Sequence, residues 1–167
     1  MKNACIVLLC LTTLLLCGCP VGSGYPLEVK ENGTVDKSLV GTWVNTDSSA
    51  EVISARISMD DDAYYKVEVL EKGENFLIDA TVFKGWLTAL GDRKFLVLQE
   101  IMDGTPAETY YVYDIAIGED AITTHDISLK VGGASAITSV SAYQNEVKGS
   151  MGFSDFLSGP ITWKKTE

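Results

Sequence analysis

Apolar and polar residues alternate with a period of two over most of the chain, which is the pattern of strands with one buried face. Tyr65, Val67 and Val69 share one face of such a segment, and Lys66 and Glu68 share the other. Turn-forming Gly, Asp and Asn residues recur about every ten residues between these segments. The pattern predicts strands over residues 39–46, 51–59, 63–71, 75–84, 85–90, 93–102, 107–117, 121–129 and 160–165.

Two segments depart from simple alternation. Residues 95–98 (Phe-Leu-Val-Leu) form a continuous apolar run, which predicts a strand buried on both faces. Within residues 134–147, Ala136, Val140, Tyr143 and Val147 are spaced by three or four, and this spacing predicts a helix before the last strand. No long amphipathic pattern precedes the helix, which disfavours a parallel fold of alternating strands and helices.

The predicted architecture is therefore mainly β, with a single domain over residues 39–167. An antiparallel meander of eight or nine strands exposes two long edges unless it closes on itself, and closure into a barrel removes both edges. A β-sandwich and an open sheet are the alternatives.

The amino terminus has a short basic head followed by an apolar run. Lys2 lies in a short head, and the apolar run that follows extends from Ala4 to Cys17. A helix needs about twenty apolar residues to span a bilayer, so this run is short for a transmembrane helix. Its length, charge and position are typical of a secretory signal peptide, which we predict over residues 1–18.

The end of the signal peptide resembles the lipobox of bacterial lipoproteins. The residues that carry the resemblance are Leu16-Cys17-Gly18-Cys19. In that family the peptidase cuts before the cysteine, so the resemblance implies that Cys19 becomes the acylated first residue. Two or more acyl chains hold a protein firmly on a membrane. Pro20 follows in place of the aspartate that retains lipoproteins at the inner membrane, which implies the outer membrane where the bacterium has two.

Residues 19–38 are predicted to be the lipidated cysteine and a flexible tether. The segment contains Gly22-Ser23-Gly24, Pro26 and Asn32-Gly33, and it shows no sustained periodicity. A flexible segment of this length has a root-mean-square reach of about 20–25 Å. The pattern therefore predicts a spacer between the lipid and the folded domain.

Cysteine placement and charge exclude several classes of function. All four cysteines lie in the first nineteen residues, so the domain has no disulfide, cysteine metal site or cysteine nucleophile. The formal net charge is −10, and loss of Lys2 on cleavage makes it −11. Because no basic stripe exists to displace counterions from phosphates, nucleic acid is not an expected partner.

The strand order resembles that of the lipocalins and lipocalin-like bacterial lipoproteins. Gly41-Thr42-Trp43 opens the first predicted strand, as the Gly-x-Trp motif does in that family, and a late helix precedes the last strand. The resemblance implies an eight-stranded barrel that holds a small apolar ligand, with Trp43 closing the floor beneath a basic side chain. Lys164 and Lys165 are the two choices for that side chain. The family's usual arginine and its Thr-Asp-Tyr turn motif are missing.

Tyrosines suggest where a ligand would bind. A tyrosine offers apolar area and one hydroxyl, which suits a ligand cavity or a protein interface. Ordinary cross-strand pairing that stabilises the sheet is the other interpretation. If side chains of this kind line a cavity, the candidates are Tyr65, Phe76, Tyr111 and Tyr113.

The chain offers little catalytic chemistry. His125 is the single histidine, and the sequence gives it neither a nucleophile nor an orienting partner. Residues 60–62 (Asp-Asp-Asp) lack the spacing of a calcium loop, and zinc would lack ligands. We predict no catalytic residues, no metal and no cofactor.

Two functions fit these features. The first is a non-catalytic binding module, anchored to the bacterial cell envelope through its acyl groups, for a small apolar ligand. The second is an interaction or inhibitor-type protein that docks a basic envelope partner, because the net charge of −11 would attract a cationic surface.

Overall fold

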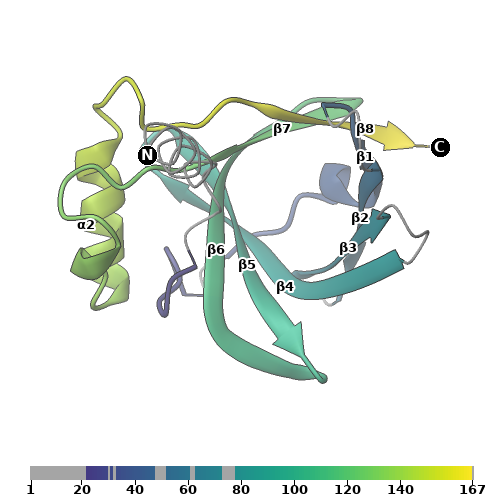
Figure 1. Ribbon diagram of the computed structural model, residues 1–167, viewed down its shortest axis with the longest axis horizontal. Coiled ribbons are helices and arrows are strands. Elements are labelled where there is room, and N and C mark those ends of the chain that lie inside the picture. The colour runs from purple at the N-terminus through teal and green to yellow at the C-terminus, as the bar shows by residue number, and fades with distance from the viewer. Residues whose placement is uncertain are drawn as a thin grey trace, which may run out of the picture.

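The computed structural model describes residues 22–29, 31, 33–47, 52–60, 63–72 and 78–166, and these residues form a closed antiparallel barrel (Figure 1). The predicted signal peptide and Cys19 lie outside the described residues. The eight strands are β1 Gly41–Asn45, β2 Val52–Met59, β3 Tyr65–Lys72, β4 Ile78–Leu90, β5 Arg93–Met102, β6 Thr105–Ile117, β7 Ala121–Asp126 and β8 Ile161–Thr166. The predicted mainly β barrel is confirmed, and the sandwich and the open sheet are excluded.

Each strand pairs with its neighbours in the sequence, and β1 pairs with β8 to close the sheet. Trp43 on β1 lies opposite Ala55 on β2 and opposite Lys165 on β8. Closure leaves no long unpaired edge, which is the physical reason for preferring a barrel at this strand number.

The structure has one long strand where the sequence predicts two, over residues 75–84 and 85–90. Gly85 lies within β4, opposite Tyr65 on β3 and Leu98 on β5. A Cβ atom at Gly85 would come 2.9 Å from Leu98 Cδ2. The glycine therefore allows close packing inside a strand and does not form a turn.

Two apolar cores lie on either side of the β4–β6 wall. The inner core fills one end of the barrel, and the outer core lies between the wall and the late helix. On β5, Phe95 and Val97 face the outer core, whereas Leu96 and Leu98 face the inner one. The predicted burial of residues 95–98 on both faces is confirmed.

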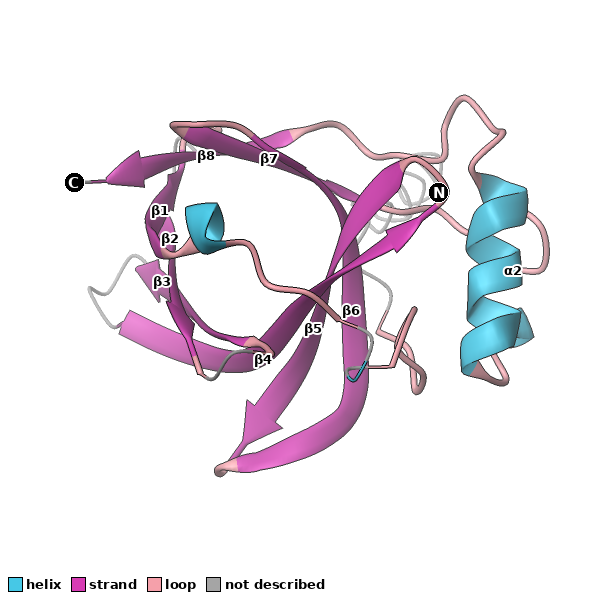
Figure 2. Cartoon of the chain, turned by 180° about the vertical axis from the view of Figure 1, so that it is seen from behind, coloured by secondary structure: helices cyan, strands magenta, loops and turns pink. Residues whose placement is uncertain are grey.

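The late helix is shorter and begins later than predicted. The 3-10 turn η4 spans Ala134–Ala136 and the helix α2 spans Val140–Ser150, in place of one helix over residues 134–147. The Ser139 side chain accepts a hydrogen bond from the backbone N–H of Ala142 at 3.1 Å, so it caps the helix at that point. Tyr143 and Val147 face the outer core, and α2 stands beside the barrel wall (Figure 2).

The described part of residues 19–38 is bound to the barrel, so the prediction of a flexible tether is wrong there. Ser23 exchanges backbone hydrogen bonds with Tyr110 at 2.9 and 2.8 Å, and Thr34 does the same with Leu87. Leu27 is buried in the outer core with 1% of its surface exposed. Apolar contacts hold this segment, although its composition is that of a linker.

Among the described residues, no helix has the length and hydropathy that a membrane span requires.

Candidate functional site

One end of the barrel is closed by a short N-terminal turn and a buried tryptophan. The 3-10 turn η3, Lys37–Leu39, crosses this end (Figure 2). Trp43 is fully buried, and its indole N–H donates a hydrogen bond of 2.8 Å to the Leu39 carbonyl. This closed end is the floor of the barrel.

Lys165 is the basic side chain that covers the floor. Its Nζ lies 5.2 Å from the centre of the Trp43 ring and donates to the Ser38 carbonyl at 3.3 Å. Gly41 makes room for it, since a Cβ at Gly41 would come 2.7 Å from Lys165 Cε. Of the two choices that the sequence leaves open, Lys165 therefore occupies the position, and the spacing of Gly41 and Trp43 has a physical reason.

Tyr65 also belongs to the floor. The side chain is fully buried, and its hydroxyl donates to the Asp36 carbonyl at 3.0 Å and accepts from the Asp36 backbone N–H. Burial raises the pKa of Tyr65 above its usual value, and the hydrogen bond with Asp36 acts in the opposite direction. Tyr65 thus fastens the N-terminal segment to the barrel.

Above the floor, the interior holds a cavity of about 390 Å³. Its described walls come from the inward-facing positions of all eight strands, and most of them are aliphatic or aromatic. The lining residues are Asn45, Ile53, Ala55, Ile57, Val67, Val69, Thr81, Phe83, Leu96, Leu98, Tyr113, Ile122, Thr124, Asp126, Ile161 and Trp163. We call this space the interior cavity.

Polar groups gather on one side of the interior cavity, where β6, β7 and β8 meet. Tyr113 on β6 lies opposite Asp126 on β7. The Trp163 indole N–H donates to the Thr124 hydroxyl at 3.0 Å. The wall therefore combines a phenol, a carboxylate and an indole–hydroxyl pair next to an apolar surface.

Burial changes the acidity of both titratable groups in this wall. Burial raises the pKa of Tyr113 well above its usual range, and the nearby negative charge of Asp126 adds to the increase. Burial also raises the pKa of Asp126, while the neighbouring His125 partly offsets that increase. Tyr113 therefore keeps its proton at neutral pH and remains a hydrogen-bond donor.

The structure separates the four predicted ligand-binding residues. Tyr113 lines the interior cavity. Tyr111 is half-buried and packs edge-on against Phe83, which lines the cavity, with 6.0 Å between the ring centres. Tyr65 belongs to the floor, and Phe76 lies outside the described residues.

Sequence reasoning missed the polar side chains of β7 and β8. Ile122, Thr124 and Asp126 alternate on β7, so the period of two could have placed them on one face. Trp163 alternates in the same way with Ile161 on β8. Alternation alone does not indicate which of the two faces of a strand points into the cavity.

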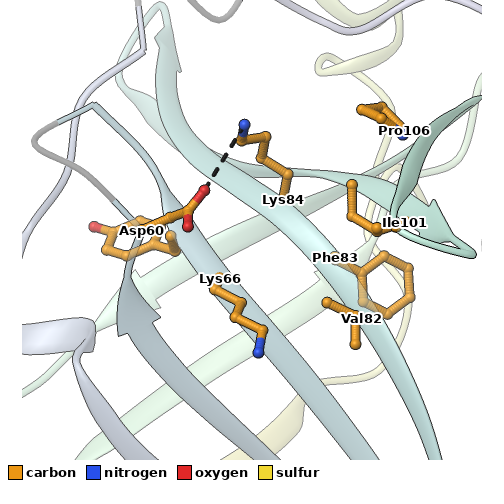
Figure 3. Close-up of a pocket in the computed structure, with 9 residues that line it drawn as sticks. Asp60, Lys66, Val82, Phe83, Lys84, Ile101 and Pro106 are labelled. Carbon is orange, nitrogen blue, oxygen red and sulfur yellow. Dashed lines mark ion pairs between the residues drawn. The ribbon is translucent and has the colours of Figure 1, made fainter.

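A second cavity, of about 350 Å³, lies beside β3, β4 and the β5–β6 hairpin (Figure 3). Asp60 and Lys84 form an ion pair of 3.8 Å across it, and Lys66 pairs with Glu68 at 2.9 Å. The close-up shows the Asp60 carboxylate directed at the Lys84 amine. Because both lysines already have carboxylate partners, the described lining of this cavity offers no free cation, and the interior cavity is the better ligand site.

The remaining candidates for chemistry have structural roles. His125 Nδ1 lies 2.8 Å from the Ser158 carbonyl, and His125 is paired with Asp114 in the β6–β7 register. Within the part of the chain that the structure describes, no three metal-ligating side chains come together. No family model, curated protein or solved structure matches this chain.

Proposed function

We propose that the chain is a bacterial envelope lipoprotein whose barrel binds a small apolar ligand. The observation that carries this proposal is the interior cavity, which is apolar over most of its wall and measures about 390 Å³. Ligand cavities of proteins typically measure about 300–1,000 Å³ and combine an apolar wall with a few polar groups.

The floor supports the same function. Trp43, Lys165 and η3 close one end of the barrel, so a ligand bound above them is shielded from water on that side. The resemblance to the lipocalins implies this arrangement of Gly41, Trp43 and a basic side chain. Because the strands hold the walls in place before any ligand enters, little ordering free energy is lost on binding.

Filling the interior cavity is expected to abolish binding. Ala55 on β2 is buried and lines the cavity. In an Ala55→Phe variant the ring would occupy the space that the ligand needs. We expect the variant to lose at least about tenfold in affinity, or about 1.4 kcal/mol, for the neutral fluorescent probe N-phenylnaphthylamine, measured by titration of its emission.

Ser54→Phe is the matched control, because Ser54 pairs with Val44 and Leu70 on the opposite face of the same strand. We expect this variant to bind the probe as the unchanged protein does. A second cavity-filling variant, Val69→Phe, should behave as Ala55→Phe does. Unchanged binding in both cavity-filling variants, with their barrel structure intact, would exclude the interior cavity as the site.

Membrane attachment through Cys19 is the other half of the proposal. In cells grown with labelled palmitate, we expect the protein to carry the label and to partition into the detergent phase. Cys19→Ser should abolish both, because the variant lacks the sulfur that accepts the acyl chain, and stable attachment to a membrane needs two or more acyl chains. Cys17→Ser should retain both and is the matched control. Label on a Cys19→Ser variant would contradict the assignment.

A further inference from the structure

We propose that the ligand of the interior cavity carries a cationic amine, which Asp126 binds as its counter-ion. The inference rests on the proposed function, because it names the chemical class of the ligand in that same cavity. Its basis is the charge of the cavity wall.

Among the described lining residues, Asp126 is the single charged side chain, and lysine and arginine are absent. Asp126 is the last residue of β7, and within the described residues no ion pair involves it. Its backbone N–H donates to the Ser158 hydroxyl at 2.8 Å, which fixes the backbone and leaves the carboxylate for other contacts. The wall therefore carries a net negative charge.

A ligand with its own carboxylate would meet this charge without a compensating cation. Bringing two negative charges together where water is excluded is unfavourable, whereas the attraction between opposite charges becomes stronger there. Fatty acids are thus disfavoured, and an apolar molecule with a protonated amine gains a charge-assisted hydrogen bond. Tyr113 opposite Asp126 offers a further hydroxyl to the same head group.

The acidic composition of the chain favours the same class of ligand. The chain as a whole has a formal net charge of −10. A negative potential of this kind draws cations toward a cavity and slows anions.

Binding of the amine is expected to depend on pH. The groups next to Asp126 are Tyr113, which lies opposite it on β6, the uncharged Ser158 before β8, and His125 beside it on β7. Burial raises the pKa of Asp126, so its charge is lost at a higher pH than for an exposed aspartate. As pH falls through that pKa, amine affinity should fall while the affinity for a neutral ligand stays constant.

The test uses three probes that share one alkyl chain and differ in the head group: octylamine, octanol and octanoate. Each displaces N-phenylnaphthylamine from the purified protein at neutral pH, with circular dichroism as the check on folding. We expect the affinity for octylamine to be at least about tenfold higher than that for octanol. Octanoate should bind most weakly of the three. Asp126→Asn should remove the advantage of the amine and leave octanol unchanged, whereas Asp126→Glu should retain the preference.

Glu119→Gln is the matched control, because it removes one acidic charge from the exposed β6–β7 turn, and it should retain the preference for the amine. Equal affinity of octylamine and octanol for the unchanged protein would overturn the inference and leave the binding function standing. A preference that persists in Asp126→Asn would also overturn it. Failure of the neutral probe and of octanol to bind would instead overturn the proposed function, and the inference with it.

Discussion

Replacing Trp43 by alanine is expected to lower the free energy of unfolding by about 3–5 kcal/mol, the usual cost of removing a fully buried tryptophan. The indole packs in the inner core and donates its N–H to the Leu39 carbonyl. Its removal therefore leaves a cavity in the floor and a buried carbonyl without its donor. Lys165 would lose the ring over which it lies.

Urea denaturation followed by circular dichroism measures this change. Trp43→Phe keeps most of the apolar contact but not the hydrogen bond, so we expect a smaller loss of about 1–2 kcal/mol. Met102→Ala is the exposed control, because 60% of Met102 is accessible to solvent, and it should change stability by less than about 0.5 kcal/mol. A loss for Trp43→Ala as small as that of the control would show that the floor is not part of the stabilising core.

Glu146→Gln is expected to lower the free energy of unfolding by about 2–3 kcal/mol. Glu146 on α2 is buried, and its carboxylate accepts backbone N–H groups from Val131, Gly132 and Gly133 at 2.9, 2.8 and 3.2 Å. An amide presents one oxygen and one N–H₂ group in place of two oxygens, so at least one donor of the loop loses its partner.

The same carboxylate makes stability depend on pH. Burial raises the pKa of Glu146, but the hydrogen bonds from Gly132, Val131 and Gly133 outweigh it and hold the pKa below its ordinary value of 4.5. The stabilisation is therefore fully present above that value and is lost as pH falls through the lower, folded-state pKa.

Urea denaturation at neutral pH and at acidic pH should show a smaller acid-dependent loss for Glu146→Gln than for the unchanged protein. Glu108→Gln, at an exposed position on β6, should follow the unchanged protein. Identical acid sensitivity in all three proteins would contradict the role assigned to Glu146.

Alternation predicted the strands, and the cost of two exposed edges favoured their closure into a barrel. Tyr113 was chosen as an aromatic candidate, and it lines the interior cavity. Alternation could not separate Tyr113 from Tyr65, since it gives the face of the sheet but not the height along the barrel axis. Height depends on strand stagger, which long-range pairing determines.

Two errors have a common cause. Composition indicates a boundary between two strands at Gly85 and a flexible tether over residues 19–38, because it reports local preference alone. The structure shows that Leu98 packs closely against Gly85 and that the outer core buries Leu27. Asp126 was missed for the same reason, since a carboxylate at a strand end is usually solvated. Tertiary contacts decide all three positions.

Because Ser23 is hydrogen-bonded to Tyr110, only the few residues before it can act as a free connection between the lipid and the barrel. With Cys19 acylated as proposed, three peptide units separate the lipid from Gly22, the first residue described, and such a stretch spans at most about 10 Å. The barrel would then lie close to the bilayer, and the side of the barrel that contains β6 would face it. A molecule leaving that membrane would have only a short distance to travel to the barrel, and the barrel could adopt few orientations relative to the bilayer.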